Sequence, residues 1–261
     1  MNNIAQEKTR SSINKPLKPK YLKSRLKELK ISNSQNRINM PINSFSKESK
    51  SHHFFEADQY GNILINYFTL HGTPSQFRRG KNKWEEKFIR KRILNPSPDT
   101  TGKINKYLSP KGSGLKPFFP PQIIKKYKNK KVIKTLFITE GEFKAFKGAM
   151  HGVDIIGVPS IHGFYDNEKS DNDKIKTLHY EIEELLKKCK VKNVVYLTDA
   201  DTMVIKRDFE KEMTNRPLSF FSGAKNFRNA MNIFLQKGII EEVYFTHINT
   251  SFSDSAKGLD D

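Results

Sequence analysis

The stretch Asn193–Thr202 reads Asn-Val-Val-Tyr-Leu-Thr-Asp-Ala-Asp-Thr, and it decides how the rest of the chain is interpreted. Val194–Leu197 is a short apolar run, which is typical of a buried strand in a parallel sheet. Asp199 and Asp201 follow it, at the strand end where open α/β sheets bind their ligands. Two carboxylates at this spacing can bind one hard cation, because Mg²⁺ prefers oxygen ligands. Taken alone, however, Asp-x-Asp is more often an ordinary turn after a strand.

The second half of the chain alternates between strand and helix patterns. We expect strands at Val132–Thr139, Asp154–Val158, Val191–Leu197 and Val243–Ile248, and helices at Gly141–Met150, Asp173–Cys189 and Ser222–Gln236. This order predicts an α/β fold with a mostly parallel four-stranded sheet and helices on both faces.

Further acidic residues are expected at the carboxyl edge of this sheet. Glu140 ends the first strand, and Gly141 after it lets a ligand or the backbone approach closely. Asp260 and Asp261 follow the last strand. Glu140, Asp199 and Asp201 therefore form a candidate cation and phosphate site. The alternatives are that Glu140 only complements a helix dipole and that the last residues are a solvated acidic tail.

The excess of basic over acidic residues lies wholly in the first half of the chain. The net charge is +19, and residues 1–50 contribute +9, residues 51–60 contribute −2 and residues 61–130 contribute +13, which leaves −1 for residues 131–261. A polyanion such as nucleic acid is the natural partner of this half. The simpler alternative is that an AT-rich genome encodes many solvated lysines throughout the protein. It does not explain why the second half of the chain is nearly neutral.

We divide the chain into three parts on this basis. Residues 1–50 are expected to be a basic, disordered arm with one helix near Tyr21–Leu29. Residues 51–130 form a basic, β-rich lead-in domain, with a turn at Asp58–Asn62, a strand at Ile63–Leu70 and either a strand or a helix within Lys83–Leu94. Residues 131–261 form the α/β domain.

Aromatic and basic residues alternate in the lead-in domain. This mixture suits a surface that contacts phosphates through Lys and Arg and stacks bases on aromatic rings. For any single aromatic residue, such as Phe118 or Phe119, a position in the core is the favoured interpretation. Arg78, Arg79 and Lys111 are candidate nucleic-acid contacts on the basis of their charge and position.

The composition excludes several classes of protein. The single cysteine, Cys189, excludes a disulfide framework and a cysteine-based zinc site. We find neither a long apolar run that spans a membrane nor the apolar core of a signal peptide. We therefore expect a protein of the cytoplasm without a membrane partner.

Four segments together resemble the TOPRIM domain of primases from bacteria, plasmids and phages. They are Thr139–Glu142, Asp199–Asp201, Lys257–Asp261 and, before the sheet, Lys106–Ser113, which is similar to the lead-in sequence of bacterial primases. The resemblance covers roughly Gly61 to Asp261. It implies a TOPRIM, Rossmann-like fold and a role in DNA replication, in a bacterial or virus-infected bacterial cell.

The resemblance also implies roles for individual residues. Glu140 would act as general acid or base, or as a ligand, Asp199 and Asp201 would bind Mg²⁺ or Mn²⁺, and Asp260 and Asp261 would complete the acidic site. Lys106 would face template or nucleotide, and Gly141 and Lys257 would also contact nucleic acid or nucleotide. The implied partners are single-stranded DNA, nucleotides and a replicative helicase.

Three functions remain open at this stage. The first is primase-like nucleotidyl transfer in a plasmid, phage or other mobile element. The second is a TOPRIM nuclease that uses the same carboxylates, and the third is a nucleic-acid-binding module without catalysis. The chain departs from bacterial primases because it lacks the cysteines of their zinc ribbon. We expect either a fragment of a longer primase or a stand-alone protein of a mobile element.

Overall fold

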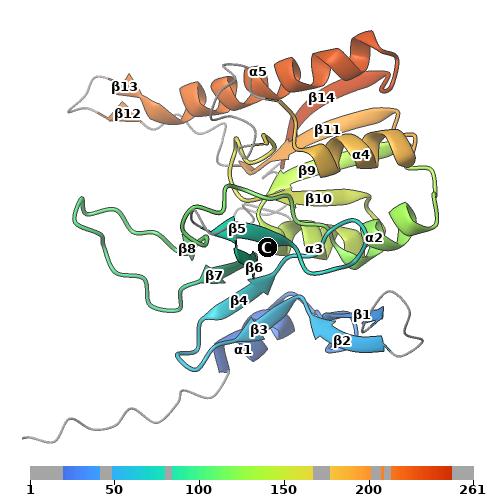
Figure 1. The fold of residues 1–261 in the computed structure, drawn as a ribbon. Coiled ribbons are helices and arrows are strands. Elements are labelled where there is room, and N and C mark those ends of the chain that lie inside the picture. Colours follow the sequence, from blue (N-terminus) through green and yellow to red (C-terminus); the bar gives the residue numbers. More distant parts are fainter. Residues whose placement is uncertain are drawn as a thin grey trace, which may run out of the picture.

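A four-stranded parallel sheet in the order β10-β9-β11-β14 is the centre of the fold (Figure 1). The computed structural model describes residues 20–41, 49–79, 84–166, 177–200, 207–208 and 213–248. The strands of the sheet are β9 (Thr135–Glu140), β10 (Ile155–Val158), β11 (Asn193–Thr198) and β14 (Glu242–His247). Strand β11 pairs in parallel with β9 on one side and β14 on the other. The predicted parallel α/β sheet is therefore confirmed, with the apolar run before Asp199 as a central strand.

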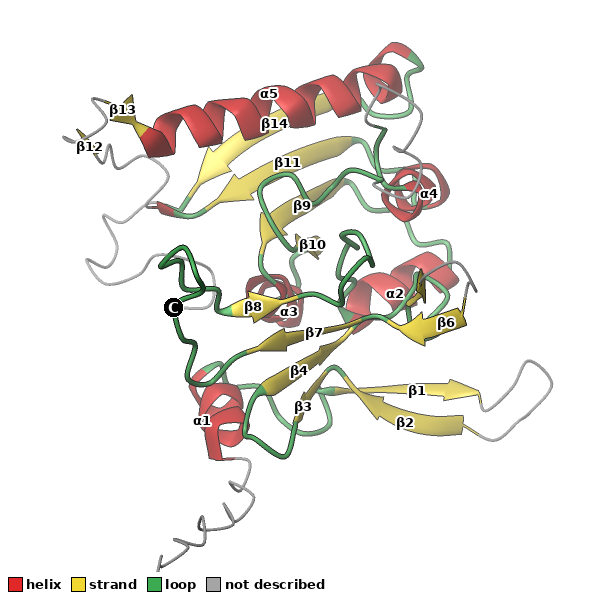
Figure 2. Cartoon of the chain, turned by 60° about the vertical axis from the view of Figure 1, so that its left-hand side comes forward, coloured by secondary structure: helices red, strands yellow, loops and turns green. Residues whose placement is uncertain are grey.

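Helices cover both faces of this sheet (Figure 2). They are α2 (Pro121–Lys128), α3 (Glu142–Met150), α4 (Tyr180–Lys188) and α5 (Asn215–Gln236). The sequence did not predict α2, which begins with a proline at its first position, where the missing N–H costs nothing.

The predicted boundaries of two helices were wrong. Helix α4 begins at Tyr180 rather than Asp173, because His179 is its N-cap and accepts a hydrogen bond from the backbone N–H of Glu181. Residues 177–179 are therefore not helical, and residues 173–176 lie outside the described part of the chain. Helix α5 begins seven residues earlier than predicted, at Asn215 rather than Ser222.

The lead-in part consists of small antiparallel sheets. One sheet contains β3 (Phe55–Ala57), β4 (Ile63–Asn66), β7 (Ile89–Arg92) and β8 (Tyr107–Leu108), and a hairpin contains β5 (Gln76–Arg79) and β6 (Trp84–Lys87). The ambiguous segment after residue 83 is thus two strands, and the strand predicted to reach Leu70 ends at Asn66. The turn at Asp58–Asn62 is confirmed, because the Asp58 carboxylate accepts from the backbone N–H groups of Tyr60 and Asn62.

The expected disorder of residues 1–50 is wrong for residues 20–41. Helix α1 (Lys20–Glu28) confirms the predicted helix, and β1 (Arg37–Pro41) pairs with β2 (Ser49–His53). Leu26, Leu29 and Ile31 join the core of the molecule. Burial of these three apolar side chains contributes to the free energy that orders this polar segment.

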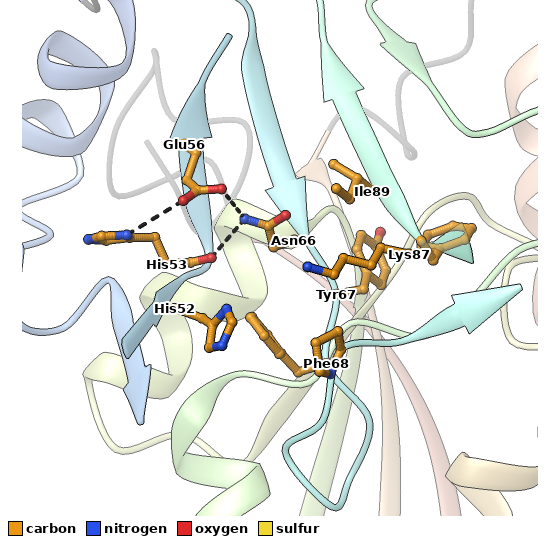
Figure 3. Close-up of a pocket in the computed structure, with 10 residues that line it drawn as sticks. His52, His53, Glu56, Asn66, Tyr67, Phe68, Lys87 and Ile89 are labelled. Carbon is orange, nitrogen blue, oxygen red and sulfur yellow. Dashed lines mark hydrogen bonds and ion pairs between the residues drawn. The ribbon is translucent and has the colours of Figure 1, made fainter. Parts of the chain in front are cut away.

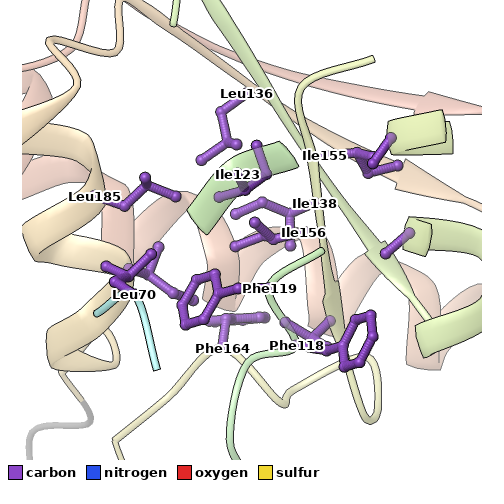
Figure 4. Close-up of a cluster of buried hydrophobic side chains, with 14 of the residues drawn as sticks. Leu70, Phe118, Phe119, Ile123, Leu136, Ile138, Ile155, Ile156, Phe164 and Leu185 are labelled. Atoms are coloured by element: carbon purple, nitrogen blue, oxygen red, sulfur yellow. The ribbon is translucent and has the colours of Figure 1, made fainter. Parts of the chain in front are cut away.

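One continuous hydrophobic core joins the lead-in part to the parallel sheet. Figure 4 shows part of it, which includes Phe118 and Phe119 of the lead-in and Ile138 of β9. Phe55 stacks on Phe143 of α3 with ring centroids 4.4 Å apart, a contact of about 1 kcal/mol beyond its burial. Phe118 and Phe119 are fully buried, so for them the core interpretation is correct. The shared core fixes the lead-in strands against the sheet that carries the candidate site.

Two features complete the described fold. A short antiparallel pair, β12 (Arg207–Asp208) with β13 (Met213–Thr214), precedes α5. Across the described ranges, no helix has the length and apolar character needed to cross a bilayer.

Candidate active site

Glu140 and Asp199 lie at the carboxyl ends of the two central strands. In the register of the parallel pair, Leu197 of β11 is opposite Thr139 of β9. Glu140 is the last residue of β9, and Asp199 comes directly after β11. The register therefore places both carboxylates at the same edge of the sheet, where parallel sheets bind ligands.

Gly141 makes the sharp turn from β9 into α3. Its φ of 104° lies in a region that residues with a side chain rarely adopt. The neighbouring strand also leaves room for this turn, because a Cβ added to Gly157 of β10 would lie 2.9 Å from the Gly141 carbonyl oxygen. The two glycines allow the start of α3 to lie directly behind the carboxylate of Glu140.

A cavity of about 190 Å³, here called the carboxylate pocket, opens at this edge. Its walls come from the sheet, from α3 and from two lead-in strands. The residues that line it are Arg90, Tyr107, Glu140, Gly141, Glu142, Phe143, Lys144, Pro159 and Asp199. The pocket thus combines three carboxylates with two cations and one tyrosine ring.

Lys144 of α3 forms an ion pair with Asp199. Its Nζ atom donates to Asp199 Oδ1 at 2.6 Å and also contacts Oδ2. The side chain of Lys144 is 17% exposed and that of Asp199 is 30% exposed, so the pair faces the open pocket. The ammonium group of Lys144 therefore neutralises Asp199. A bound metal ion can take the place of Lys144 beside Asp199, and a substrate phosphate can take the place of Asp199 beside Lys144.

Glu140 is more readily protonated than an ordinary glutamate. Its side chain reaches solvent at the pocket mouth, but the loss of hydration there raises the pKa of its carboxyl group. The charges of Asp199 and Glu142 also raise the pKa, whereas Lys144 and Arg90 act in the opposite direction. A raised pKa is what a carboxyl group that takes up or releases a proton near neutral pH requires.

A buried ion pair forms the floor of the pocket. The Glu142 carboxylate accepts hydrogen bonds from Arg90 of β7 and from the hydroxyl of Tyr67, and the Arg90 and Glu142 side chains are 9% and 1% exposed. Burial alone would lower the pKa of Arg90, but Glu142 and Tyr67 outweigh it and raise the pKa. Burial and the charge of Glu142 raise the pKa of Tyr67, so its hydroxyl stays neutral and donates. This network ties the lead-in sheet to α3.

Tyr107 brings an aromatic ring to the pocket wall. The guanidinium carbons of Arg90 and Arg92 lie 5.1 and 5.6 Å from the centroid of its ring, within the range of cation–π contact. Tyr107 belongs to the lead-in segment Lys106–Ser113 that resembles primases. The lead-in part therefore contributes directly to the carboxylate pocket.

Besides the apolar Phe143 and Pro159, sequence reasoning missed four polar residues of the pocket. Glu142 and Lys144 lie in the first turn of the helix that follows Glu140, and this closeness in sequence was a signal for them. Tyr107 lies beside Lys106, which was proposed instead. No sequence signal pointed to Arg90, because only the fold brings β7 to α3.

Three proposed basic contacts do not line this pocket. Lys106 and Lys111 are exposed in the lead-in, and Arg78 lies on the β5–β6 hairpin, where its Nε is 3.7 Å from Glu85 Oε1. For Arg79 only the backbone, in β5, is described. Four further predicted residues, Asp201, Lys257, Asp260 and Asp261, lie outside the described residues.

The described carboxylates supply part of a cation site. Glu140 and Asp199 offer hard oxygen ligands at one mouth, which suits Mg²⁺ or Mn²⁺. Within the described ranges, however, no three His, Cys, Asp or Glu side chains are grouped closely enough to hold a metal ion. A complete site would need a further ligand, for which Asp201 is the sequence-based candidate.

A second cavity, of about 120 Å³, lies in the lead-in part (Figure 3). Asn66 Nδ2 donates to Glu56 Oε2 at 2.8 Å, and His53 Nδ1 lies 3.6 Å from the other oxygen of Glu56, so these polar groups satisfy one another. The Tyr67 residue lines this cavity, while its hydroxyl reaches Glu142 in the carboxylate pocket. Tyr67 thus links the wall of this cavity to Glu142 of the carboxylate pocket.

Comparison with known proteins gives a distant resemblance to primases. No protein-family model matches the chain, and no curated protein matches it. The Aquifex aeolicus primase (zinc binding and RNA polymerase domains) aligns with a TM-score of 0.38 and 15% identity over 88% of this chain and 44% of that one. The DnaG catalytic core aligns with a TM-score of 0.39 and 13% identity over 81% of this chain and 49% of that one. The chain spans less than half the length of either structure.

Proposed function

We propose that this protein is a primase-like, Mg²⁺-dependent nucleotidyl transferase that acts on single-stranded DNA in the replication of a plasmid, phage or other mobile element. The convergence of Glu140 and Asp199 at the ends of adjacent parallel strands carries the proposal. The TOPRIM-like sequence around both residues supports the same chemistry.

Three residues of the pocket have direct roles in this reaction. Glu140, with its raised pKa, takes the proton from the attacking 3′-hydroxyl group as its oxygen bonds to the α-phosphorus of the incoming nucleotide and pyrophosphate leaves. Lys144 lies beside Asp199, where its ammonium group neutralises phosphate oxygens of the incoming nucleotide. Asp199, with Asp201, would hold Mg²⁺, which when bound stabilises the charge that develops on the transferred phosphoryl group.

The lead-in wall of the pocket favours joining nucleotides over cutting DNA. A joining enzyme must position two substrates, whereas a nuclease positions one strand and a water molecule. Tyr107 lines the pocket beside the carboxylates, and the guanidinium group of Arg92 contacts its ring. Such a surface can stack a base and contact a phosphate.

One assay separates the three functions. The protein is incubated with single-stranded DNA, labelled ribonucleotides or deoxyribonucleotides, and Mg²⁺ or Mn²⁺. New short oligomers are expected, and they must be absent with Asp199→Asn. Shortened DNA would instead identify a TOPRIM nuclease. Unchanged DNA and nucleotides, together with salt-sensitive DNA binding, would identify a binding module without catalysis.

A further inference from the structure

The parallel sheet separates charge between its two edges. Strand β9 follows Lys134 and ends in Glu140, and strand β11 follows Lys192 and is followed by Asp199. At about 3.3 Å per residue, the two edges lie roughly 20 Å apart. The sheet therefore has a basic amino edge and an acidic carboxyl edge, which the near-neutral net charge of residues 131–261 does not reveal.

Six exposed lysines gather at the amino edge without an acidic partner among the described residues. They come from the end of α2 and from the loops that enter β9 and β11, and they are Lys125, Lys128, Lys130, Lys131, Lys134 and Lys190. We call them the amino-edge lysines. Their charges are not cancelled locally, so the edge carries a concentrated positive potential.

The carboxylates near this edge are already engaged. Asp154 pairs with Lys126 at 2.6 Å, Glu241 pairs with Lys192 at 2.6 Å, and Glu183 pairs with Lys187. Glu184 accepts from the Tyr127 hydroxyl. These acidic groups therefore leave the amino-edge lysines available to an external anion.

The backbone holds the lysines in a fixed arrangement. The backbone N–H of Ile133 donates to the Cys189 carbonyl at 2.9 Å, and that of Asn193 donates to the Lys134 carbonyl at 3.0 Å. These hydrogen bonds join the two loops that carry the lysines. The positive charges thus lie on adjoining loops of the two central strands rather than on a free tail.

Two of the lysines have a backbone conformation that glycine adopts more readily than lysine does. Lys130 and Lys190 follow α2 and α4 with φ of 52° and 48°, in the left-handed region. At the equivalent positions after α3 and α5, which lead to the outer strands, the chain has Gly152 and Gly238. Lysine is thus present at the centre of the edge despite its conformational cost. The helix dipole explains lysines in the last turn of a helix but not those beyond it.

We propose that the amino-edge lysines are a second contact surface for nucleic acid, which they bind through backbone phosphates. A polyanion fits the six charges, and at this edge it is distant from the carboxylates that would repel it. A strand bound here lies away from the reacting bond. This template role rests on the proposed function, in which the surface anchors template while the carboxylate pocket is occupied.

The double variant Lys130→Gly/Lys190→Gly tests this proposal in the full-length protein. Glycine suits the left-handed conformation, so the melting temperature should stay the same or rise, and misfolding is not a confounding effect. Binding of labelled oligothymidylate is measured by fluorescence anisotropy over a range of salt concentrations. The slope of log K against log salt should fall by about 1.4, since each phosphate contact in a single strand contributes about 0.7.

The matched control is Lys225→Gln/Arg228→Gln, which removes two exposed charges from α5. Its salt slope should equal that of the wild type. An unchanged slope in the glycine variant would overturn the proposal and would leave an acidic protein as the partner to test. An equal fall in both variants would also overturn it, because the effect would then report net charge alone.

Discussion

Lys144 Nζ lies 2.6 Å from Asp199 Oδ1, so the first acidic residue of the Asp-x-Asp pair is neutralised from within the protein. The ammonium group approaches the carboxylate from the pocket, where a metal ion would also approach it. Because both side chains are partly exposed, separating them costs less than separating a buried ion pair. Lys144 therefore competes with a cation for Asp199.

The variant Lys144→Met should bind Mn²⁺ more tightly and form less product. Removal of a competing interaction of about 1 kcal/mol corresponds to about fivefold in affinity. Loss of the ammonium group also removes a cation that faces the substrate phosphate. Mn²⁺ binding is measured by electron paramagnetic resonance. Lys147→Met on the same helix is the control, and equal Mn²⁺ affinity in Lys144→Met and wild type would contradict the competition.

Asp199→Asn and Asp201→Asn should each abolish product formation but not DNA binding. Both substitutions remove a hard anionic ligand and one negative charge near the bound polyanion. Binding is therefore expected to be unchanged or tighter, as measured by anisotropy with oligothymidylate. Full activity in both single variants would show that the metal site has been assigned to the wrong residues.

Glu140→Gln should stabilise the protein at neutral pH while it removes activity. The pKa of Glu140 is raised on folding above its ordinary value of 4.5, so between these two values the folded state binds more protons than the unfolded state. Stability is therefore lost as pH rises through this window, and the glutamine variant avoids that loss. Loss of general acid–base catalysis costs about 10²–10⁴-fold in rate.

Urea unfolding without divalent cations measures the effect on stability. The glutamine variant should be more stable than the wild type at neutral pH, and the difference should vanish below the ordinary pKa of glutamate. A difference that is the same at both pH values would mean that the ionisation of Glu140 is not its cause.

Replacing Arg90 alone should destabilise the protein more than replacing Arg90 and Glu142 together. Arg90→Met leaves the Glu142 carboxylate buried with only Tyr67, which should cost about 3–5 kcal/mol of stability. Arg90→Met/Glu142→Leu removes both charges and should cost less than the single change. Urea unfolding measures both variants, and additive losses would contradict the coupling of the two residues.

The sequence predicted the sheet because its strands are short apolar runs with clear ends. Periodicity reports which side chains are buried, so it located all four parallel strands to within a few residues. Gly141 and Asp58 marked the ends of strands because their residue types favour turns. Signals of this kind are carried by neighbouring residues in the chain, so they do not depend on the rest of the fold.

Contacts between distant segments were not predictable in this way. Arg90 and Glu142 are 52 positions apart, and only the packing of β7 against α3 brings them together. Lys144 and Asp199 are also 55 positions apart, so the local sequence could not show that Asp199 has a partner. Helix α1 was also underestimated as part of the core, because its few apolar residues are diluted by lysines.

Deletion of residues 1–19 and deletion of residues 1–50 should have different effects. Residues 1–19 contain four basic residues and one acidic residue, a net charge of +3, so their removal should weaken DNA binding and flatten its salt dependence. Removal of residues 1–50 also removes Leu26, Leu29 and Ile31 from the core, and at about 2 kcal/mol each this should lower the melting temperature sharply. Thermal unfolding and anisotropy separate the two effects. If the shorter deletion left the salt slope unchanged, the first 19 residues would not contact the polyanion.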